Sequence, residues 1–148
     1  MTITDSIKIK ARPEKIFNFL TSLKDTESYK AWHPEHVVMY WIKGKPFAEG
    51  SIAYFEEYLH GKIQKAKFIC TKVVPNRLIE YRPPFPLSII FPGNRFIIEA
   101  VDEGNCIFTA TVRARMGPLS KRLSRRQLEG VKRHMKEEGE NLKAVVED

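Results

Sequence analysis

The chain has 148 residues, of which 43% are hydrophobic and 29% are charged, so it can fold as one globular domain spanning residues 1–148. This composition excludes a disordered or fibrous protein, and no apolar run approaches the length of a membrane-spanning helix. The net charge of +7 raises nucleic acid or an acidic membrane surface as partners, but no nucleic-acid-binding motif accompanies the basic residues, and a solvated helix face explains them better. We therefore expect no nucleic-acid partner and no stable membrane anchor.

The N-terminal residues lack the basic start and the apolar run of a signal peptide. The two cysteines, Cys70 and Cys106, lie within apolar strand patterns, where free thiols are usually buried. Buried free thiols are typical of a reducing compartment. The sequence therefore favours a cytoplasmic protein.

A strand and two short helices are predicted first. Residues 3–10 alternate between apolar and polar side chains, which is typical of a strand. A helix is predicted to begin at Pro13, because proline suits the first helical position and Glu14 favours the first turn. A second helix is predicted over residues 25–31, before Pro34, since the residue that precedes a proline disfavours the helical conformation.

Six further strands and a long helix follow. A hairpin is indicated at Asp102-Glu103-Gly104-Asn105, and Gly117-Pro118 is expected to end the sheet. The last helix is predicted from about Ser120 to Val146. The predicted strands cover residues 37–42, 51–59, 65–74, 78–82, 95–101 and 106–115.

Four prolines crowd residues 83–92, a stretch that also carries Phe85, Leu87, Ile89 and Ile90. Proline cannot donate to a sheet ladder, so this stretch is a loop or a broken edge strand. Three interpretations stay open for its apolar side chains. They form a flap over an apolar cavity, they tuck into the core, or they make an exposed interaction surface.

The predicted C-terminal helix carries a carboxylate on the side that it buries. At the helical period, Glu138 falls in the middle of an apolar stripe, and His134 lies one turn earlier at its edge. A buried carboxylate without a partner is costly, so Glu138 needs a cation, hydrogen bonds or a metal ion. The stripe consists of Leu128, Val131, Met135, Leu142 and Val145.

His134 and Glu138 can supply two ligands to one metal ion, because they share one face of the helix. The segment Trp32-His33-Pro34-Glu35-His36 offers a third ligand in His33 or His36. Another interpretation stays open, in which His134 and Glu138 form only a hydrogen-bonded pair. The adjacent Glu56 and Glu57 point to opposite faces of their strand, so the one that faces inward can supply a fourth ligand.

The order of elements resembles that of the START and birch-pollen-allergen superfamily, the helix-grip fold. The segment Ala11-Arg12-Pro13-Glu14-Lys15-Ile16-Phe17, which opens the first helix, is common in that superfamily. The resemblance implies an α+β fold, in which a curved antiparallel sheet of about seven strands wraps around the C-terminal helix. It also implies a large apolar cavity, in which members bind lipids, hormones or polyketides.

Within this superfamily, the chain is similar in layout to the diacetylphloroglucinol and phloretin hydrolases. These enzymes hold zinc with a histidine, a strand glutamate and a His-x-x-x-Glu pair on the last helix. They cleave a carbon–carbon bond between an aromatic ring and an acyl group. The zinc ligands that the resemblance implies are His33, Glu57, His134 and Glu138, with Glu56 as the alternative to Glu57.

Residues near such a metal would transfer protons. His36 and His60 can act as acid or base near neutral pH, although His60 also fits a surface turn beside Gly61. The family also uses a catalytic tyrosine. The candidates for it are Tyr40, Tyr54, Tyr58 and Tyr81.

These patterns favour a small-molecule pocket protein with a divalent-metal site, a candidate zinc-dependent hydrolase of an aromatic or polyketide-like ketone. The first alternative is a non-catalytic carrier or sensor of a hydrophobic small molecule or lipid, in which His134 and Glu138 anchor a ligand hydroxyl. The second is an interaction module. The walls of the cavity are expected from Phe55, Phe68, Phe96, Ile98 and Phe108.

Overall fold

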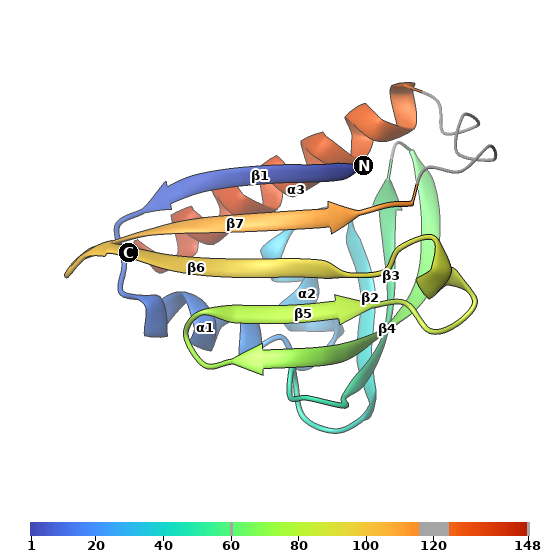
Figure 1. Ribbon diagram of the computed structural model, residues 1–148, viewed down its shortest axis with the longest axis horizontal. Helices are drawn as coiled ribbons and strands as arrows, with labels where there is room; N and C mark the ends of the chain where they lie inside the picture. Colours follow the sequence, from blue (N-terminus) through green and yellow to red (C-terminus); the bar gives the residue numbers. More distant parts are fainter. Residues whose placement is uncertain (60, 116–124, 148) are drawn as a thin grey trace.

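A single antiparallel sheet of seven strands dominates the computed structural model, which describes all residues except 60, 116–124 and 148 (Figure 1). The strand order is β1-β7-β6-β5-β4-β3-β2, so the first strand pairs with the last. Every predicted strand is present, with its ends shifted by a few residues at most. The strands are β1 (Thr2–Ile9), β2 (His36–Lys43), β3 (Ile52–Leu59), β4 (Lys62–Val74), β5 (Leu78–Arg82), β6 (Asn94–Asp102) and β7 (Asn105–Arg113).

Three α-helices in the described part of the chain pack on this sheet: α1 (Pro13–Thr21), α2 (Thr26–Trp32) and α3 (Arg125–Val146). The N-terminus of α2 is closed by a capping box, in which the Asp25 carboxylate accepts the Ser28 N–H at 2.9 Å. The predicted start of α3 and the expected Gly117-Pro118 stop lie among the residues that are not described. None of the helices in the described ranges is both long and apolar enough to cross a membrane.

Alternation along the strands directs the apolar side chains to the face that α3 covers. In β7, Cys106, Phe108 and Ala110 are buried, while the residues between them are partly exposed. The long helix α3 runs across this face and buries Met135 and Leu142 (Figure 1). The sheet and the last helix therefore enclose one core, as the helix-grip fold requires.

Aromatic rings occupy much of the interior where we expected a cavity. The centroids of successive rings lie 5.2 to 5.6 Å apart. A separate hollow of about 770 Å³, between α1, the β4–β5 turn and β6, is lined by the predicted wall residue Ile98 but by none of the predicted ligand or catalytic residues that the structure describes. The five predicted wall residues all pack in this interior. The rings belong to Trp41, Phe47, Phe68, Tyr81, Phe96 and Phe108.

The proline-rich segment lies on the surface, at the end of the sheet where β5 passes into β6 (Figure 1). It contains one short 3₁₀ helix, η1 (Leu87–Ile89). Phe85 is 77% exposed, and Leu87, Ile89 and Ile90 are also exposed. Of the three interpretations of this segment, the structure agrees with an exposed apolar surface.

Candidate metal centre

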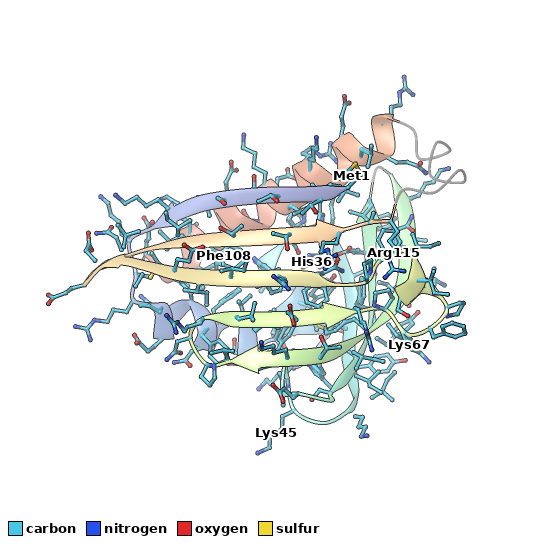
Figure 2. The ribbon with its side chains drawn as sticks, viewed as in Figure 1. Met1, His36, Lys45, Lys67, Phe108 and Arg115 are labelled. Atoms are coloured by element: carbon cyan, nitrogen blue, oxygen red, sulfur yellow. The ribbon has the colours of Figure 1, made fainter. Side chains whose placement is uncertain are left out.

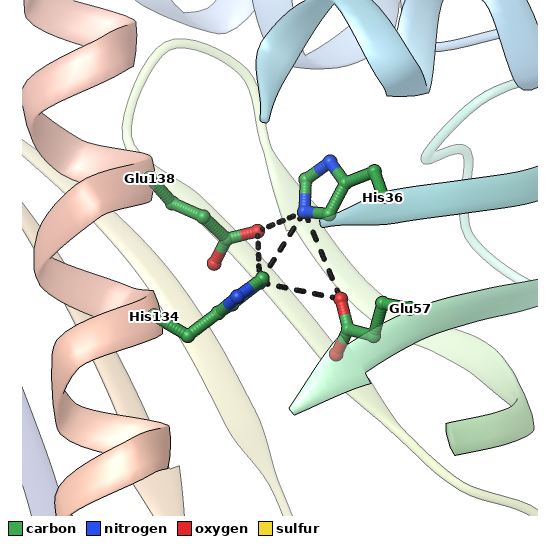
Figure 3. A group of neighbouring side chains, drawn as sticks. All are labelled: His36, Glu57, His134 and Glu138. Carbon is green, nitrogen blue, oxygen red and sulfur yellow. Dashed lines mark hydrogen bonds and ion pairs between the residues drawn. The ribbon is translucent and has the colours of Figure 1, made fainter. Parts of the chain in front are cut away.

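Four side chains from three elements converge on one point inside the fold (Figure 3). His36 is the first residue of β2, and Glu57 lies opposite it on β3 in the register of the sheet. His134 and Glu138 face them from successive turns of α3. Each residue contributes one nitrogen or oxygen atom, and the four atoms lie within 4.8 Å of one another.

The spacing of these atoms matches the ligand shell of a small cation. His36 Nε2 lies 2.9 Å from Glu138 Oε2 and 3.7 Å from Glu57 Oε2. His134 Nε2 lies 3.3 Å from each of those two oxygens and from His36 Nε2. Four ligands about 2.1 Å from a tetrahedral zinc ion are separated from one another by about 3.4 Å. The cluster therefore needs little rearrangement to surround a divalent ion.

The orientation of His36 is fixed by Tyr29 on α2. His36 Nδ1 lies 2.8 Å from the Tyr29 carbonyl oxygen, and the two rings stack with their centroids 3.7 Å apart. A carbonyl only accepts hydrogen bonds, so Nδ1 must carry a proton and donate it. Nε2 is consequently the nitrogen that faces Glu57 and Glu138, and it is the atom that can bind a metal.

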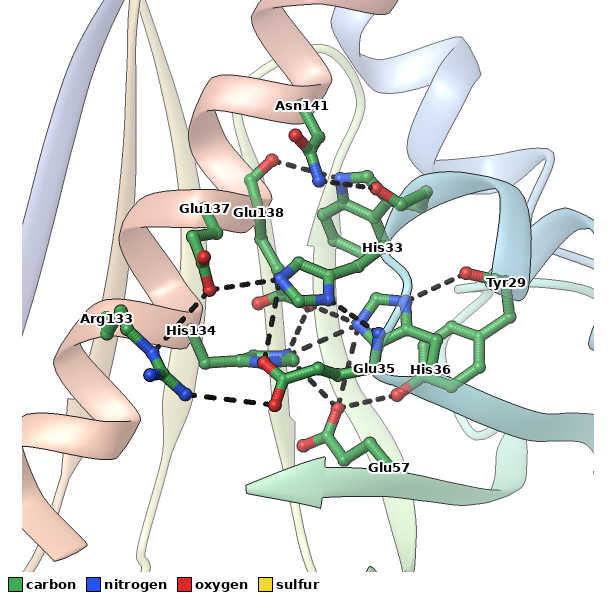
Figure 4. A network of polar contacts seen from close by, with 11 residues as sticks. Tyr29, His33, Glu35, His36, Glu57, Arg133, His134, Glu137, Glu138 and Asn141 are labelled. Atoms are coloured by element: carbon green, nitrogen blue, oxygen red, sulfur yellow. Dashed lines mark hydrogen bonds and ion pairs between the residues drawn. The ribbon is translucent and has the colours of Figure 1, made fainter. Parts of the chain in front are cut away.

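Further hydrogen bonds hold the other elements around the cluster (Figure 4). The Tyr29 hydroxyl donates to Glu57 Oε2 at 2.7 Å, so one tyrosine supports two of the four residues. Trp32 Nε1 donates to the Glu138 carbonyl at 3.0 Å, and the Asn141 amide donates to the Trp32 carbonyl at 2.9 Å. These bonds tie α2 to α3 beside the site.

The metal-free cluster is held together by charge. Burial alone would lower the pKa of His134, but hydrogen bonds and charges from Glu138 and Glu57 raise it to about 11. Burial alone would raise the pKa of Glu138, but hydrogen bonds from His134 and His36 hold it at about 2. A protonated His134 therefore bridges two carboxylates at neutral pH.

One buried atom of the cluster lacks a hydrogen-bond partner among the residues that the structure describes. This atom is Nδ1 of His134, a residue that is 4% exposed. The nearest carboxylate is that of Glu35, whose Oε1 lies 3.5 Å away. Glu35 also lies 3.8 Å from the guanidinium of Arg133, which is exposed on α3 (Figure 4). The unpaired nitrogen thus points towards an acid that can approach it.

His33, which we expected as a ligand, lies beside the four-residue cluster rather than in it. Its Nδ1 accepts the Glu35 N–H at 2.9 Å, so in the neutral ring the proton is on Nε2, which lies 3.3 Å from Glu137 Oε1. Both ring nitrogens are therefore engaged, whereas His36 presents Nε2 to the cluster. His33 belongs to a second, overlapping group with Glu35 and His134.

The structure also settles which strand glutamate faces inward. Glu57 points into the cluster, while Glu56 accepts a hydrogen bond of 2.7 Å from Tyr54 on the other face of β3. Tyr40 and Tyr58 are exposed, which leaves Tyr81 as the candidate tyrosine inside the fold. The predicted catalytic residue His60 lies outside the described residues.

Two supporting residues were missed by the sequence analysis. Tyr29 appeared only as part of a short helix, and Glu35 only as part of the Trp32–His36 segment. Tyr29 could have been predicted as a supporting residue, because a tyrosine can make hydrogen bonds and this one lies in the helix that precedes the histidine-rich segment. The cluster also affects Tyr81, whose pKa is raised by burial and by the negative charges of Glu138 and Glu57.

Residues 1–147 match the family described as polyketide cyclase / dehydrase and lipid transport, and the chain belongs to this family. The fold is the helix-grip α+β fold that the sequence predicted. Among curated proteins, none matches the chain closely enough to count as a relative.

Several solved structures share the fold over nearly the whole chain. The Zhui aromatase/cyclase from Streptomyces sp. R1128 is 12% identical with a TM-score of 0.77, covering 99% of this chain and 93% of that one. Norcoclaurine synthase from Thalictrum flavum, solved with dopamine and hydroxybenzaldehyde, is 10% identical with a TM-score of 0.75, covering 99% and 86%. Ara h 8.0201 is 14% identical with a TM-score of 0.67, covering 99% and 97%. These likenesses show the fold.

The raised pKa of His134 makes the stability of the metal-free protein depend on pH. Because the pKa rises from 6.5 to about 11 on folding, the stabilisation is complete below pH 6.5 and is lost as the pH rises towards 11. We expect His134→Gln to lower the free energy of unfolding most near pH 6.5 and progressively less above it. Urea unfolding in EDTA across this range measures the difference, with the exposed Lys132→Gln as control. A difference that stays constant with pH would contradict the assignment.

Proposed function

We propose that this protein is a divalent-metal-dependent hydrolase, with zinc as the preferred ion, that acts on a ketone of an aromatic or polyketide-like small molecule. The observation that carries the proposal is the convergence of His36, Glu57, His134 and Glu138 at ligand-to-ligand distances. The family description and the aromatase/cyclase neighbour support a polycyclic or aromatic substrate class.

The chemistry of the donor set fits zinc. Two imidazole nitrogens and two carboxylate oxygens are ligands that zinc accepts, and together they balance its charge. Tyr29 makes hydrogen bonds with both His36 and Glu57. Residues that orient metal ligands commonly make such bonds. When bound, a divalent cation would supply Lewis acidity that polarises a ketone carbonyl and activates water.

The residues of the chain would bind the substrate and transfer the proton. In the hydrolysis of an acyl-phenol, water adds to the acyl carbon, the bond to the ring carbon breaks, and the ring carbon gains a proton. Tyr81 packs between Phe68 and Phe96, with ring centroids 5.2 Å from each. A tyrosine hydroxyl is protonated at neutral pH, and Tyr81 is the candidate tyrosine that packs inside the fold, so we assign it as the acid that protonates the ring carbon.

The two neighbouring histidines, His33 and His36, are expected to contribute differently to zinc binding. We expect His36→Ala to weaken zinc binding about 100-fold or more, because it removes a ligand, and His33→Ala to change it by less than about tenfold. Competition with a chromophoric chelator measures both affinities. Elemental analysis of the untagged wild type, purified without a metal-chelating resin, should find about one ion per chain. No metal after reconstitution, or equal losses in both variants, would contradict the site.

Glu35 is expected to act as the outer partner of His134. When Nε2 binds a metal, Nδ1 must carry a proton, and Glu35 Oε1 at 3.5 Å is positioned to accept it. We expect Glu35→Gln to weaken zinc binding by about 10- to 100-fold. The matched control is Glu56→Gln, which removes a carboxylate from the opposite face of β3. Equal affinities in Glu35→Gln and in the wild type would contradict this role.

The proposed reaction gives a direct test of activity. The zinc-loaded protein should hydrolyse an acyl-phenol to the phenol and a carboxylic acid, lose activity in EDTA and regain it with zinc. Tyr81→Phe should lower kcat by about 100-fold or more without changing the affinity for zinc, because it removes a proton donor. Tyr58→Phe, at an exposed position, is the control.

Separate results would point to the alternative function. A protein that holds zinc and co-purifies with a hydrophobic compound, but turns over no acyl-phenol, would favour a carrier or sensor. Chromatography of the reaction products and mass spectrometry of the purified protein distinguish the two outcomes.

A further inference from the structure

The proline-rich segment presents a concentrated apolar surface, which we call the apolar loop and define as residues 85–90. Four large apolar side chains within these six residues are exposed. Phe85 is 77% exposed, Ile89 52%, Leu87 48% and Ile90 45%. Single exposed apolar residues are normal, but a contiguous group of this kind marks a site of interaction.

The apolar loop is held in this outward conformation by the backbone. The N–H groups of Ile90 and Phe91 donate to the Leu87 carbonyl at 3.0 and 2.9 Å. The Arg115 N–H donates to the Ile90 carbonyl at 2.8 Å, which fixes the loop against the chain that leaves β7. The apolar side chains are therefore displayed by a folded segment.

The surroundings of the apolar loop are basic. Residues 81–98 contain no Asp or Glu, and Arg82 is exposed just before the loop. Arg113, the last residue of β7, and Arg115, two residues further on, are exposed, and Arg115 lies beside the loop (Figure 2). Arg95 is paired with Glu80, so that charge is already balanced. Arg82, Arg113 and Arg115, which form no ion pair within the described part of the chain, flank the exposed apolar side chains.

We propose that this end of the molecule docks reversibly on an anionic lipid membrane. Phe85, Leu87 and Ile89 would enter the boundary between headgroups and acyl chains, while Arg113 and Arg115 contact the phosphates. An anionic bilayer has apolar acyl chains beneath negatively charged headgroups. This matches exposed apolar side chains that are flanked by arginines. The inference is independent of the proposed metal chemistry, because neither the loop nor the arginines belong to the cluster.

The docked orientation would bring the candidate metal centre towards the membrane. The C-terminal ends of β3 and β5 lie at the same end of the antiparallel sheet, and Glu57 is close to the C-terminal end of β3. A hydrophobic compound dissolved in the bilayer would then lie near the cluster. The protein would thus take up its hydrophobic small molecule from the bilayer.

Sedimentation with vesicles tests the proposal on the full chain. The probes are vesicles of phosphatidylcholine alone and of phosphatidylcholine with phosphatidylglycerol, each at low and at high salt. We expect the wild type to prefer the anionic vesicles and to lose part of this binding in salt. The double variant Leu87→Ser with Ile89→Ser should bind the anionic vesicles about tenfold more weakly or worse, because less apolar surface enters the bilayer.

The matched control is Val101→Ser with Val145→Ser. These residues are 53% and 47% exposed, close to the exposures of Ile89 and Leu87, but they lie at the opposite end of the sheet and of α3. The control should bind like the wild type, and unfolding curves of both double variants show whether each is folded. Arg113→Gln with Arg115→Gln should remove most of the preference for anionic vesicles, at about fivefold per charge.

Several outcomes would overturn the proposal. They are a wild type that binds neither vesicle, a loop variant that binds as well as the wild type, and equal losses in the loop variant and its control. Self-association of the wild type that the loop variant lacks, without vesicle binding, would also overturn it and would assign the apolar loop to a protein partner.

Discussion

The buried charge cluster between α3 and the start of the sheet is the constraint on which the rest of the site depends. His134 and Glu138 are attached to the helix, whereas His36 and Glu57 face each other across two strands. Charges removed from water are stable only when they are paired, so helix and sheet must hold one relative position. The same contact that fixes α3 against the sheet therefore builds the candidate metal centre.

In the proposed function, a metal ion would replace the proton that His134 shares with two carboxylates of this cluster. In the metal-free protein, the proton of His134 satisfies the two carboxylates at distances that also suit a metal ion. Tyr29 would keep its two bonds after such a replacement, because they hold the far side of His36 and an oxygen of Glu57. Support of this kind, from rigid neighbours, is what lets a site bind without reorganisation.

Much of the fold could be predicted because its causes are local. Alternation in residues 106–110 and the helical stripe around Met135 follow from the geometry of a single strand or helix. Phe47 could not be predicted as a core residue. It lies in a loop, with a φ of 53°, and stacks on Phe68 of β4, a contact between separate segments that no local pattern indicates.

The order of strands and helices and the pair His134 and Glu138 can be predicted from the amino-acid pattern, since both follow from periodicity along single elements. The residues that meet that pair are set by tertiary packing. The choice of His36 over His33 depends on the Tyr29 carbonyl of a neighbouring helix, and the choice of Glu57 over Glu56 depends on the phase of β3 against β2. Contacts between distant elements are set by packing and register, which no local pattern in the sequence encodes.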